Sequence, residues 1–404
     1  MRPILLKGHE RSITCVVYNR DGDLIFTAAK DGRPTLWLSE DGTRVGTYEV
    51  HNGAVWHLDV SWDSKLLVSG SADMHAKVWD VETGSELTTF EHTGSVRNCT
   101  FDESGRRILV HCDAFGGLDQ NRPPLVSIYE NEPMWGDVTS WRRAAQFQLP
   151  HPEAGEVKCQ LVRWLPLGKQ ILCAFEDGNM KIMDSMSFST VREIQAHDNK
   201  IQCLSYNLHQ TFLLSASTDH TCKMWDLETW DCVKTYRSDR PLNACVFSPT
   251  KEHVLLGGGQ DAMSVTTTAG RQGRFETQFY HLAYEEEFGR VKGHFGPINA
   301  LAISPLGKSY CSGAEDGYIR LHHFDADYLD MKDPVPEDEP AAESDGEMAV
   351  LVLEAEEVAD AEAAAPHADA ERRMAAGHAL AMADFAYSEA TFAAAGVEEA
   401  GPSV

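Results

Sequence analysis

Four residue types recur along this chain at fixed offsets, which constrains its fold more than any other feature. A histidine is followed by a serine or threonine at +18, an aspartate at +22 and a tryptophan at +28, and the last unit has His322 in place of the tryptophan. Such self-similarity predicts a repeat architecture. The four sets are His9, Thr27, Asp31 and Trp37; His51, Ser69, Asp73 and Trp79; His197, Ser215, Asp219 and Trp225; and His294, Ser312 and Asp316.

Weaker copies of the pattern raise the number of units to seven. Asp177 has Cys173 at the hydroxyl position and Met183 at the aromatic position, Asp261 follows Gly257, and Asp113 marks the remaining unit. Most intervals between these aspartates are near forty residues. The longer third and last intervals predict insertions around residues 116–124, 131–141 and 270–289.

Each unit also contains short alternating or apolar runs separated by turn residues. In the first unit these runs are residues 13–19, 23–29, 34–39 and 43–50, and DGD, KDG and EDG turns lie between them. Four strands per unit at spacings near forty residues are typical of a β-propeller blade of the WD40 type. The sequence therefore predicts an all-β, seven-bladed WD40 propeller.

Closure of the ring supports the same number of blades. The seventh unit stops at its third run, residues 318–324, and the segment Pro3 to Leu6 precedes the first Gly-His as a fourth strand would. An unclosed ring would leave exposed strand edges. We therefore expect the N-terminal strand to complete the last blade.

The His, Ser and Asp residues also match the residue types of a hydrolase triad, such as His51, Ser69 and Asp73. Catalysis needs one asymmetric site, whereas these residues recur in unit after unit. A hydrogen-bonded set that rigidifies each blade explains the repetition without chemistry. We interpret the sets as a structural network, and we expect no enzyme activity.

Other candidate sites have simpler explanations. The stretch GGGQ, residues 257–260, lacks the Lys-Ser/Thr of a phosphate loop and is interpreted as a turn. His322 and His323 are neighbours on a predicted strand, so they point to opposite faces and are expected to pack rather than to bind a metal. The ten cysteines are scattered singly, which favours reduced thiols and predicts neither disulfides nor a cofactor or metal site.

Charge divides the chain in two. Residues 333–404 contain 18 acidic residues, 2 arginines and 22 alanines, whereas residues 1–332 contain 44 acidic and 33 basic residues, a net charge of −11. We therefore expect the propeller to span residues 1–332 and an acidic, Ala-rich extension to span 333–404. Neither a long apolar segment nor a basic patch is present, so we expect no membrane association, no direct nucleic-acid binding and a cytoplasmic or nuclear location.

The extension is predicted to be a disordered linker over residues 333–346, followed by partly helical segments at 347–365 and 369–395. Leu380, Phe385 and Phe392 form part of one apolar face of the second segment. Two interpretations stay open. The helices dock onto a basic surface of a complex, or the tail is solvated and binds nothing.

Four stretches resemble one family in particular. They are GHERSITCVVYNRDGDLIFTAAKD, GAVWHLDVSWDSKLLVSGSADMHAKVWD, RPLNACVFSPTKEHVLLGGGQDAMSVTTT and FYHLAYEEEFGRVKGHFGPINALAISPLGKSYCSGAEDGYIRLHHFD. GGGQDAMSVTTT and EEEFGRVKGHFGPIN are not general propeller sequence. The chain resembles the WD-repeat i subunit of eukaryotic translation initiation factor 3 over residues 1 to about 328, weakly from 113 to 195 and not in the tail.

The resemblance implies a scaffold subunit of the factor that recruits messenger RNA and initiator tRNA to the small ribosomal subunit, and hence a cytoplasmic location. It implies binding to a C-terminal helix of the b subunit and to the g subunit. The acidic contact for that helix is expected near blades five and six, at Asp226 and Asp239, with Trp230 as apolar neighbour. His209 departs from the acidic residue expected in the same region.

A generic WD40 signalling adaptor, such as a G-protein-β-like or receptor-associated propeller, is the alternative. It would share the fold but lack GGGQDAMSVTTT and the long hairpin of the sixth unit.

Overall fold

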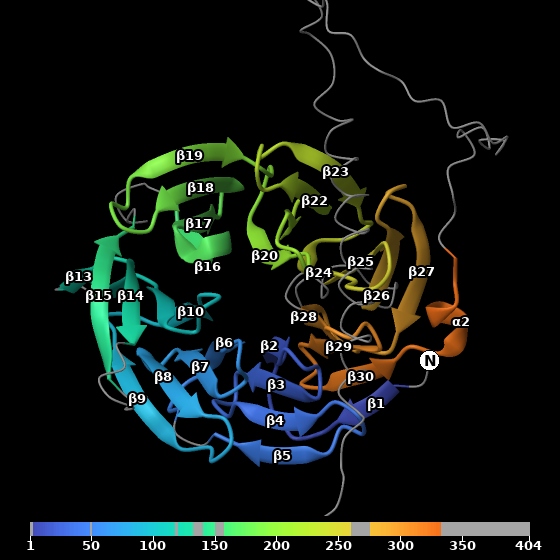
Figure 1. Ribbon diagram of the computed structural model, residues 1–404, viewed down its shortest axis with the longest axis horizontal. Helices are drawn as coiled ribbons and strands as arrows, with labels where there is room; N and C mark the ends of the chain where they lie inside the picture. Colours follow the sequence, from blue (N-terminus) through green and yellow to red (C-terminus); the bar gives the residue numbers. More distant parts are fainter. Residues whose placement is uncertain are drawn as a thin grey trace, which may run out of the picture. The chain divides into compact units, whose positions relative to one another are not determined.

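Seven four-stranded antiparallel sheets follow one another around a common axis in the computed structural model (Figure 1). The structure describes residues 3–48, 51–117, 120–131, 140–149, 157–259 and 275–332. Each sheet is one blade, and its four strands run outward from the axis as strands a, b, c and d. The predicted seven-bladed, all-β propeller is confirmed.

Blades one to three are built from consecutive strands except where a small hairpin interrupts the third. Blade one contains β2 (Ile13–Tyr18), β3 (Leu24–Ala29), β4 (Thr35–Leu38) and β5 (Arg44–Thr47). Blade two contains β6 (Val55–Val60), β7 (Leu66–Ser71), β8 (His75–Asp80) and β9 (Glu86–Glu91). Blade three contains β10 (Val96–Phe101), β11 (Arg107–Cys112), β14 (Leu125–Asn131) and β15 (Trp141–Gln148), with β12 (Phe115–Gly117) and β13 (Gln120–Arg122) between its second and third strands.

Blades four to six repeat the same order. Blade four contains β16 (Cys159–Trp164), β17 (Gln170–Phe175), β18 (Asn179–Asp184) and β19 (Thr190–Gln195), with the short helix η2 (Pro166–Gly168) between the first two strands. Blade five contains β20 (Ile201–Tyr206), β21 (Phe212–Ser217), β22 (Thr221–Asp226) and β23 (Cys232–Arg237). Blade six contains β24 (Leu242–Phe247), β25 (His253–Gly258), β26 (Glu276–His281) and β27 (Glu287–Lys292).

Blade seven closes the ring with strands from both ends of the propeller. It contains β28 (Ile298–Ile303), β29 (Ser309–Ala314), β30 (Ile319–His323) and β1 (Pro3–Leu6). β1 pairs antiparallel with β30, and Leu6 lies opposite Ile319. The expected closure by the N-terminal strand is confirmed. The edge of β30 is thereby covered.

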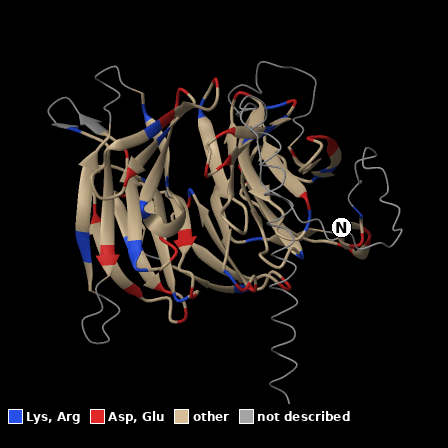
Figure 2. Cartoon of the chain, turned by 45° about the horizontal axis from the view of Figure 1, so that its top comes forward, with Lys and Arg blue, Asp and Glu red and all other residues tan. Residues whose placement is uncertain are grey.

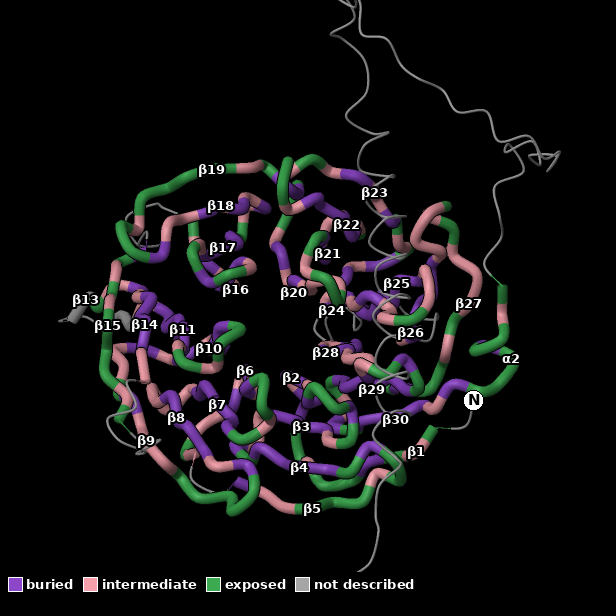
Figure 3. The backbone as a smooth tube through the Cα atoms, in the orientation of Figure 1, coloured by how far each residue is buried: buried purple, intermediate pink, exposed green. Residues whose placement is uncertain are grey.

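The hydrophobic core lies between neighbouring blades. The b strands are buried along their whole length in blades two and five, and Leu58 of blade two packs with Phe26 and Trp79 in one cluster. The outermost strand β19 carries mostly exposed residues, and β5 carries exposed and partly buried residues, as Figure 3 shows. This gradient from buried to exposed explains why the central strands are apolar runs and the outer strands are polar.

One predicted insertion lies elsewhere than expected. Residues Glu276–His281 and Glu287–Lys292 are the c and d strands of blade six, not inserted sequence. The additional residues of this blade lie between Gly258, where β25 ends, and Glu276. Gln260 and most of this connection, including Asp261, are outside the described residues. The GGGQ stretch begins inside β25, and Gly259 follows with a φ of 146°, a conformation that favours glycine.

The described chain ends with a short helix after β30. Helix α2 (Ala326–Leu329) is capped by Asp325, and its Tyr328 is buried against blade six, where its hydroxyl lies 2.9 Å from His253 Nδ1. The chain divides into two units, Met1–Asp333 and Pro334–Val404. The linker and helices expected in the extension lie outside the described residues. No helix in the described ranges is long and apolar enough to span a membrane.

Candidate functional site

The repeated polar residues of blade two form one connected network. His51 Nδ1 lies 2.8 Å from Asp73 Oδ2, and His51 Nε2 lies 2.7 Å from Ser69 Oγ. Trp79 Nε1 donates to the same Ser69 oxygen at 2.8 Å. A neutral histidine with its proton on Nδ1 satisfies every group, because Ser69 then donates to Nε2 and accepts from Trp79. The network therefore joins the connection before strand a to strands b and c.

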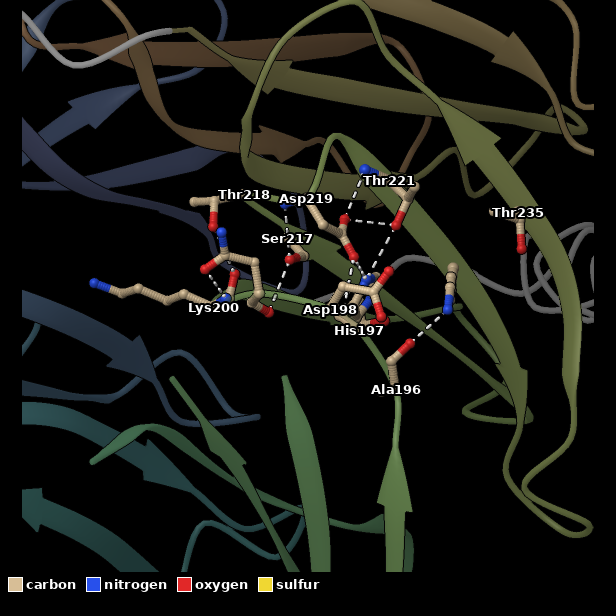
Figure 4. A network of polar contacts seen from close by, with 12 residues as sticks. Ala196, His197, Asp198, Lys200, Ser217, Thr218, Asp219, Thr221 and Thr235 are labelled. Atoms are coloured by element: carbon tan, nitrogen blue, oxygen red, sulfur yellow. Dashed lines mark hydrogen bonds and ion pairs between the residues drawn. The ribbon is translucent and has the colours of Figure 1, made fainter. Parts of the chain in front are cut away.

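Blades one and five repeat this geometry, and Figure 4 shows its His197 and Asp219 part in blade five. His9 lies 2.8 Å from both Asp31 and Thr27, and His197 lies 2.8 Å from Asp219 and 2.7 Å from Ser215. The tryptophan bonds are 2.9 Å for Trp37 to Thr27 and 2.8 Å for Trp225 to Ser215. The fixed offsets in the sequence thus correspond to fixed contacts.

Blade seven departs from the pattern where the tryptophan is replaced. His294 Nε2 lies 2.8 Å from Ser312 Oγ and Nδ1 lies 3.2 Å from Asp316 Oδ2. Arg320 donates to Asp316 at 3.2 Å and also contacts His294. His322 stacks on Tyr310 with ring centroids 4.7 Å apart, so it packs as expected. Burial, aided by the charge of Arg320, lowers the pKa of His294.

The aspartate of each network is held in its charged form. Burial alone would raise the pKa of Asp73, but hydrogen bonds from His51 and from the backbone N–H groups of Asn52 and His75 outweigh it and hold that pKa well below its ordinary value. The pKa values of Asp219 and Asp316 are lowered by the corresponding bonds against the same effect of burial. Protonation of these carboxylates would therefore oppose folding.

The network has the hydrogen-bond order of a hydrolase triad, but its hydroxyl groups are not accessible to a substrate. Ser69, Ser215 and Thr27 are 0% exposed, and Ser312 is 1% exposed. In blades one, two and five a tryptophan N–H already occupies the hydroxyl oxygen. No substrate atom can approach these hydroxyls without unpacking the blade, so the geometry supports a structural role.

Two of the weaker units are also described by the structure. In blade four, Cys173 Sγ lies 3.9 Å from Met183 Sδ, at the positions of the hydroxyl and the tryptophan. In blade three, Asp113 does not occupy the network position. Its N–H donates to Ser95 O, just as the N–H of Lys30 donates to Ser12 O in blade one. Asp113 therefore corresponds to Lys30, one residue before the network aspartate Asp31. Its carboxylate instead joins Arg97 at 2.5 Å and Lys158 at 3.1 Å.

The antiparallel order of each blade gives the propeller two different faces. The networks lie at the d–a and b–c connections, which we call the network face. The a–b and c–d turns lie at the opposite ends of the strands, which we call the turn face. Any partner contact is therefore assigned to one of these faces by its position in the blade.

Asp226, predicted to contact a partner, is a support residue. It is only 4% exposed, and its carboxylate accepts from the N–H groups of Glu228 at 2.8 Å and Thr229 at 3.3 Å. It thereby shapes the c–d turn of blade five on the turn face. Contact between Asp226 and a partner stays a prediction, and the carboxylate that would make it caps its own turn and is largely withdrawn from solvent.

Trp230 and Asp239 are not brought together. Trp230 is half-buried in the c–d turn with a φ of 63°, before β23 begins, and Asp239 is exposed after β23 ends. A six-residue strand spans roughly 20 Å, so the two side chains lie on opposite faces. The sequence could have indicated this separation, because the two positions flank one predicted strand.

Asp239 also has partners within the propeller. Its carboxylate accepts from Arg240 at 2.9 Å and from Arg290 at 3.2 Å, and Arg290 is also bonded to Glu287. These hydrogen bonds, led by that from Arg240, lower the pKa of Asp239 to about 2. The two guanidinium groups neutralise the acid that was expected to face a basic helix.

Sequence reasoning missed a different acidic surface. The described c–d turns, residues 39–43, 81–85, 185–189, 227–231 and 282–286, contain no lysine or arginine. In blades five and six they carry Glu228, Asp231, Glu285 and Glu286, next to the aromatic residues Trp230 and Tyr284. We call these six residues the acidic edge. The sequence signal for these turns was the similarity of residues 80–85 (DVETGS) and 226–231 (DLETWD), which follow the third strands of two units.

The two c–d turns of the acidic edge are connected by β23. Lys234 Nζ donates to Ala283 O at 2.9 Å, and Tyr236 Oη donates to Leu282 O at 2.9 Å. Elsewhere on the propeller, acidic and basic residues are interspersed along the visible strands and turns (Figure 2). The two turns themselves thus contribute only acidic charges, while Lys234 of β23 and Arg192, which donates to Thr229 O, bring cations against their backbone.

The fold and the repeated His, Ser/Thr, Asp and Trp network together define a WD-repeat β-propeller, a class of scaffold protein. The particular family follows from comparison with known proteins. The EIF3I family model matches residues 1–333.

Curated relatives agree with this match over nearly their full length. Eukaryotic translation initiation factor 3 subunit I of Xenopus tropicalis is 45% identical over 338 residues, which cover 82% of this chain and 99% of the relative. The Danio rerio protein is 44% identical and the Homo sapiens protein 43% identical, each with the same coverage. The chain belongs to the family of eukaryotic translation initiation factor 3 subunit I. The resemblance seen in the sequence is confirmed, and the adaptor alternative is set aside.

Proposed function

We propose that this chain is a non-enzymatic scaffold subunit that holds the b and g subunits of initiation factor 3 together. Through the complex, it supports recruitment of messenger RNA and initiator tRNA to the small ribosomal subunit in the cytoplasm. It needs no cofactor, and it binds nucleic acid only through its partners. Family membership, the buried hydroxyls and the absence of any metal-holding cluster among the described residues support this proposal.

The acidic edge is the proposed contact for the C-terminal helix of the b subunit. It combines acids from two neighbouring blades with Trp230 and Tyr284, and this combination suits a basic amphipathic helix. Asp226 acts as a positioning residue, since it holds the backbone that presents Glu228 and Trp230. The four acids beside Trp230 and Tyr284 on two neighbouring turns are the observation that carries the proposal.

Charge reversal at the acidic edge tests the contact. Asp231→Lys combined with Glu286→Lys is expected to lower the salt concentration at which the b subunit dissociates, while the melting temperature stays unchanged, because both side chains are exposed. The matched control is Glu40→Lys combined with Glu82→Lys, since these acids occupy c–d turns of blades one and two. Equal salt resistance of the two double variants would contradict the proposed contact.

A further inference from the structure

The turn face of blade four differs from that of the other blades. Met186 is 82% exposed and Leu167 is 73% exposed, which places them among the most exposed large apolar side chains of the described residues. They lie in the c–d and a–b turns of one blade. The two turns are joined where Ser185 N–H donates to Lys169 O at 2.9 Å. The two exposed side chains therefore lie on turns that are hydrogen-bonded to each other.

Equivalent positions in other blades show that Met186 is unusual. The turn Asp184-Ser-Met-Ser-Phe-Ser matches Asp80-Val-Glu-Thr-Gly-Ser and Asp226-Leu-Glu-Thr-Trp-Asp, so Met186 stands where blades two and five have Glu82 and Glu228. Asp184 holds the turn by accepting from the N–H groups of Met186 and Ser187 at 3.1 and 2.7 Å. The fold therefore accepts glutamate at this position and does not require methionine.

Leu167 is unfavourable in two respects: its apolar side chain is exposed to solvent, and its backbone has a positive φ. Its φ is 65° and its ψ is 0°, a region that bulky side chains rarely adopt and that aspartate and asparagine adopt more readily. Blades one and two have Asp21 and Asp63 at the corresponding turn position, neither of them with a positive φ, and blade seven has Leu306, which is 50% exposed. Packing within the propeller does not cover the exposed Leu167 side chain, whereas contact with a partner would.

Cations surround this apolar pair. Lys169 follows Leu167 by two residues, and Arg106 lies in the neighbouring a–b turn, whose Glu103 accepts from Leu167 N–H at 3.4 Å. Both cations are exposed and form no ion pair with another described residue. The blade-four patch, meaning Leu167, Met186, Lys169 and Arg106, thus combines two apolar side chains with two cations, and the acid Glu103 is hydrogen-bonded to the backbone of Leu167.

We propose that the blade-four patch binds an acidic amphipathic segment of another protein in the factor, with apolar side chains on Leu167 and Met186 and Asp or Glu residues beside Lys169 and Arg106. A basic helix of the kind proposed for the acidic edge would be repelled here. A second copy of this chain would bring its own cations against these cations. The patch has no aromatic residue on which the bases of RNA could stack.

Site-specific cross-linking in the purified factor tests the proposal. A benzophenone amino acid at position 186 is expected to cross-link one segment of another subunit that is rich in Asp, Glu and large apolar residues. The matched control is the same probe at position 82, which has the equivalent place in blade two. Equal yields at both positions, or cross-links from position 186 to a basic segment, to RNA or to a second copy, would overturn the proposal.

Variants then measure the contribution of each side chain. Binding of a synthetic peptide of the cross-linked segment is expected to weaken about tenfold or more in Met186→Glu and in Leu167→Asp, because each loses a desolvated apolar contact and gains a repelling charge. Both variants should keep the melting temperature, since other blades carry these residue types. Unchanged peptide affinity in either folded variant would contradict the patch. The inference rests on membership of the factor, and b-subunit retention at the acidic edge reports on the proposed function separately.

Discussion

Pro3 of β1 lies opposite His322 of β30 in the antiparallel register of blade seven. Next to this pair, Leu6 is 1% exposed and packs with Trp37 and Ile319 in one core cluster. The N-terminal strand therefore contributes both hydrogen bonds and core volume to the last blade. Its loss would expose an edge strand and open the ring between blades seven and one.

Leu6→Ala is expected to destabilise the propeller by about 2–5 kcal/mol, because it leaves a cavity at the closure. Leu5→Ala is the matched control, since Leu5 neighbours Leu6 on the same strand but is 38% exposed. Denaturant unfolding of both variants measures the difference. Equal stability of the two variants would show that closure does not depend on packing by β1.

Asp73→Ala and Asp219→Ala are each expected to cost on the order of 1–3 kcal/mol, because each change leaves a buried His and hydroxyl pair without its acceptor. Asp21→Ala, at an exposed turn position, should have little effect. Thermal melting of the three variants checks the prediction. An unchanged melting temperature in both network variants would mean that the network does not stabilise the blades.

His111 predicts a pH dependence of stability. It is 1% exposed and stands where the other six blades have alanine or glycine. Burial lowers the pKa of His111 to about 4, whereas an unfolded histidine has a pKa of about 6.5. Between these two pKa values the unfolded chain binds more protons than the folded chain, so the free energy of unfolding falls as the pH falls.

His111→Ala should therefore reduce the loss of stability between about pH 7 and about pH 5, even if the smaller side chain lowers stability at both pH values. His209→Ala, at an exposed position, is the control. Unfolding free energies at the two pH values measure the effect. A pH dependence equal to that of the wild type in His111→Ala would contradict the assignment.

Truncation after Lys332 is expected to leave the melting temperature unchanged. The last described contacts of the chain to the propeller include Tyr328 with His253 and Met331 O with Lys251 Nζ, and the truncation keeps both. Sedimentation with ribosomal subunits then separates the two interpretations of the tail, since only docking requires a loss of association. An unfolded truncated protein would instead place part of the extension inside the domain.

The number of blades, the closure and the network could be predicted because each depends on local sequence at a fixed spacing. Thr27, Ser69 and Ser215 are recognisable by offset alone, and the register of their strands makes the same contact each time. Glu276–His281 was mistaken for inserted sequence because a long connection before it displaced the repeat. Asp113 was misplaced by one residue: His92 precedes β10 as His51 precedes β6, and its +22 offset falls on Ala114, which leaves blade three without the network aspartate.

Exposed turn residues were harder to predict because exposure is decided by turn geometry. Asp226 and Glu228 are both acidic and two residues apart, yet one caps the turn and the other is exposed. The two ends of a strand lie on opposite faces of the propeller, so Trp230 and Asp239 lie far apart although they are close in sequence. Comparing equivalent turns across blades identifies such positions better than residue type does.

Native mass spectrometry of the complex purified through this chain tests the scaffold role most directly. The account predicts that the chain is recovered with the b and g subunits in one stable assembly, and that weakening the acidic edge by Asp231→Lys and Glu286→Lys releases b from it. Recovery of the folded chain without either subunit, under conditions in which the rest of the factor remains intact, would contradict the account.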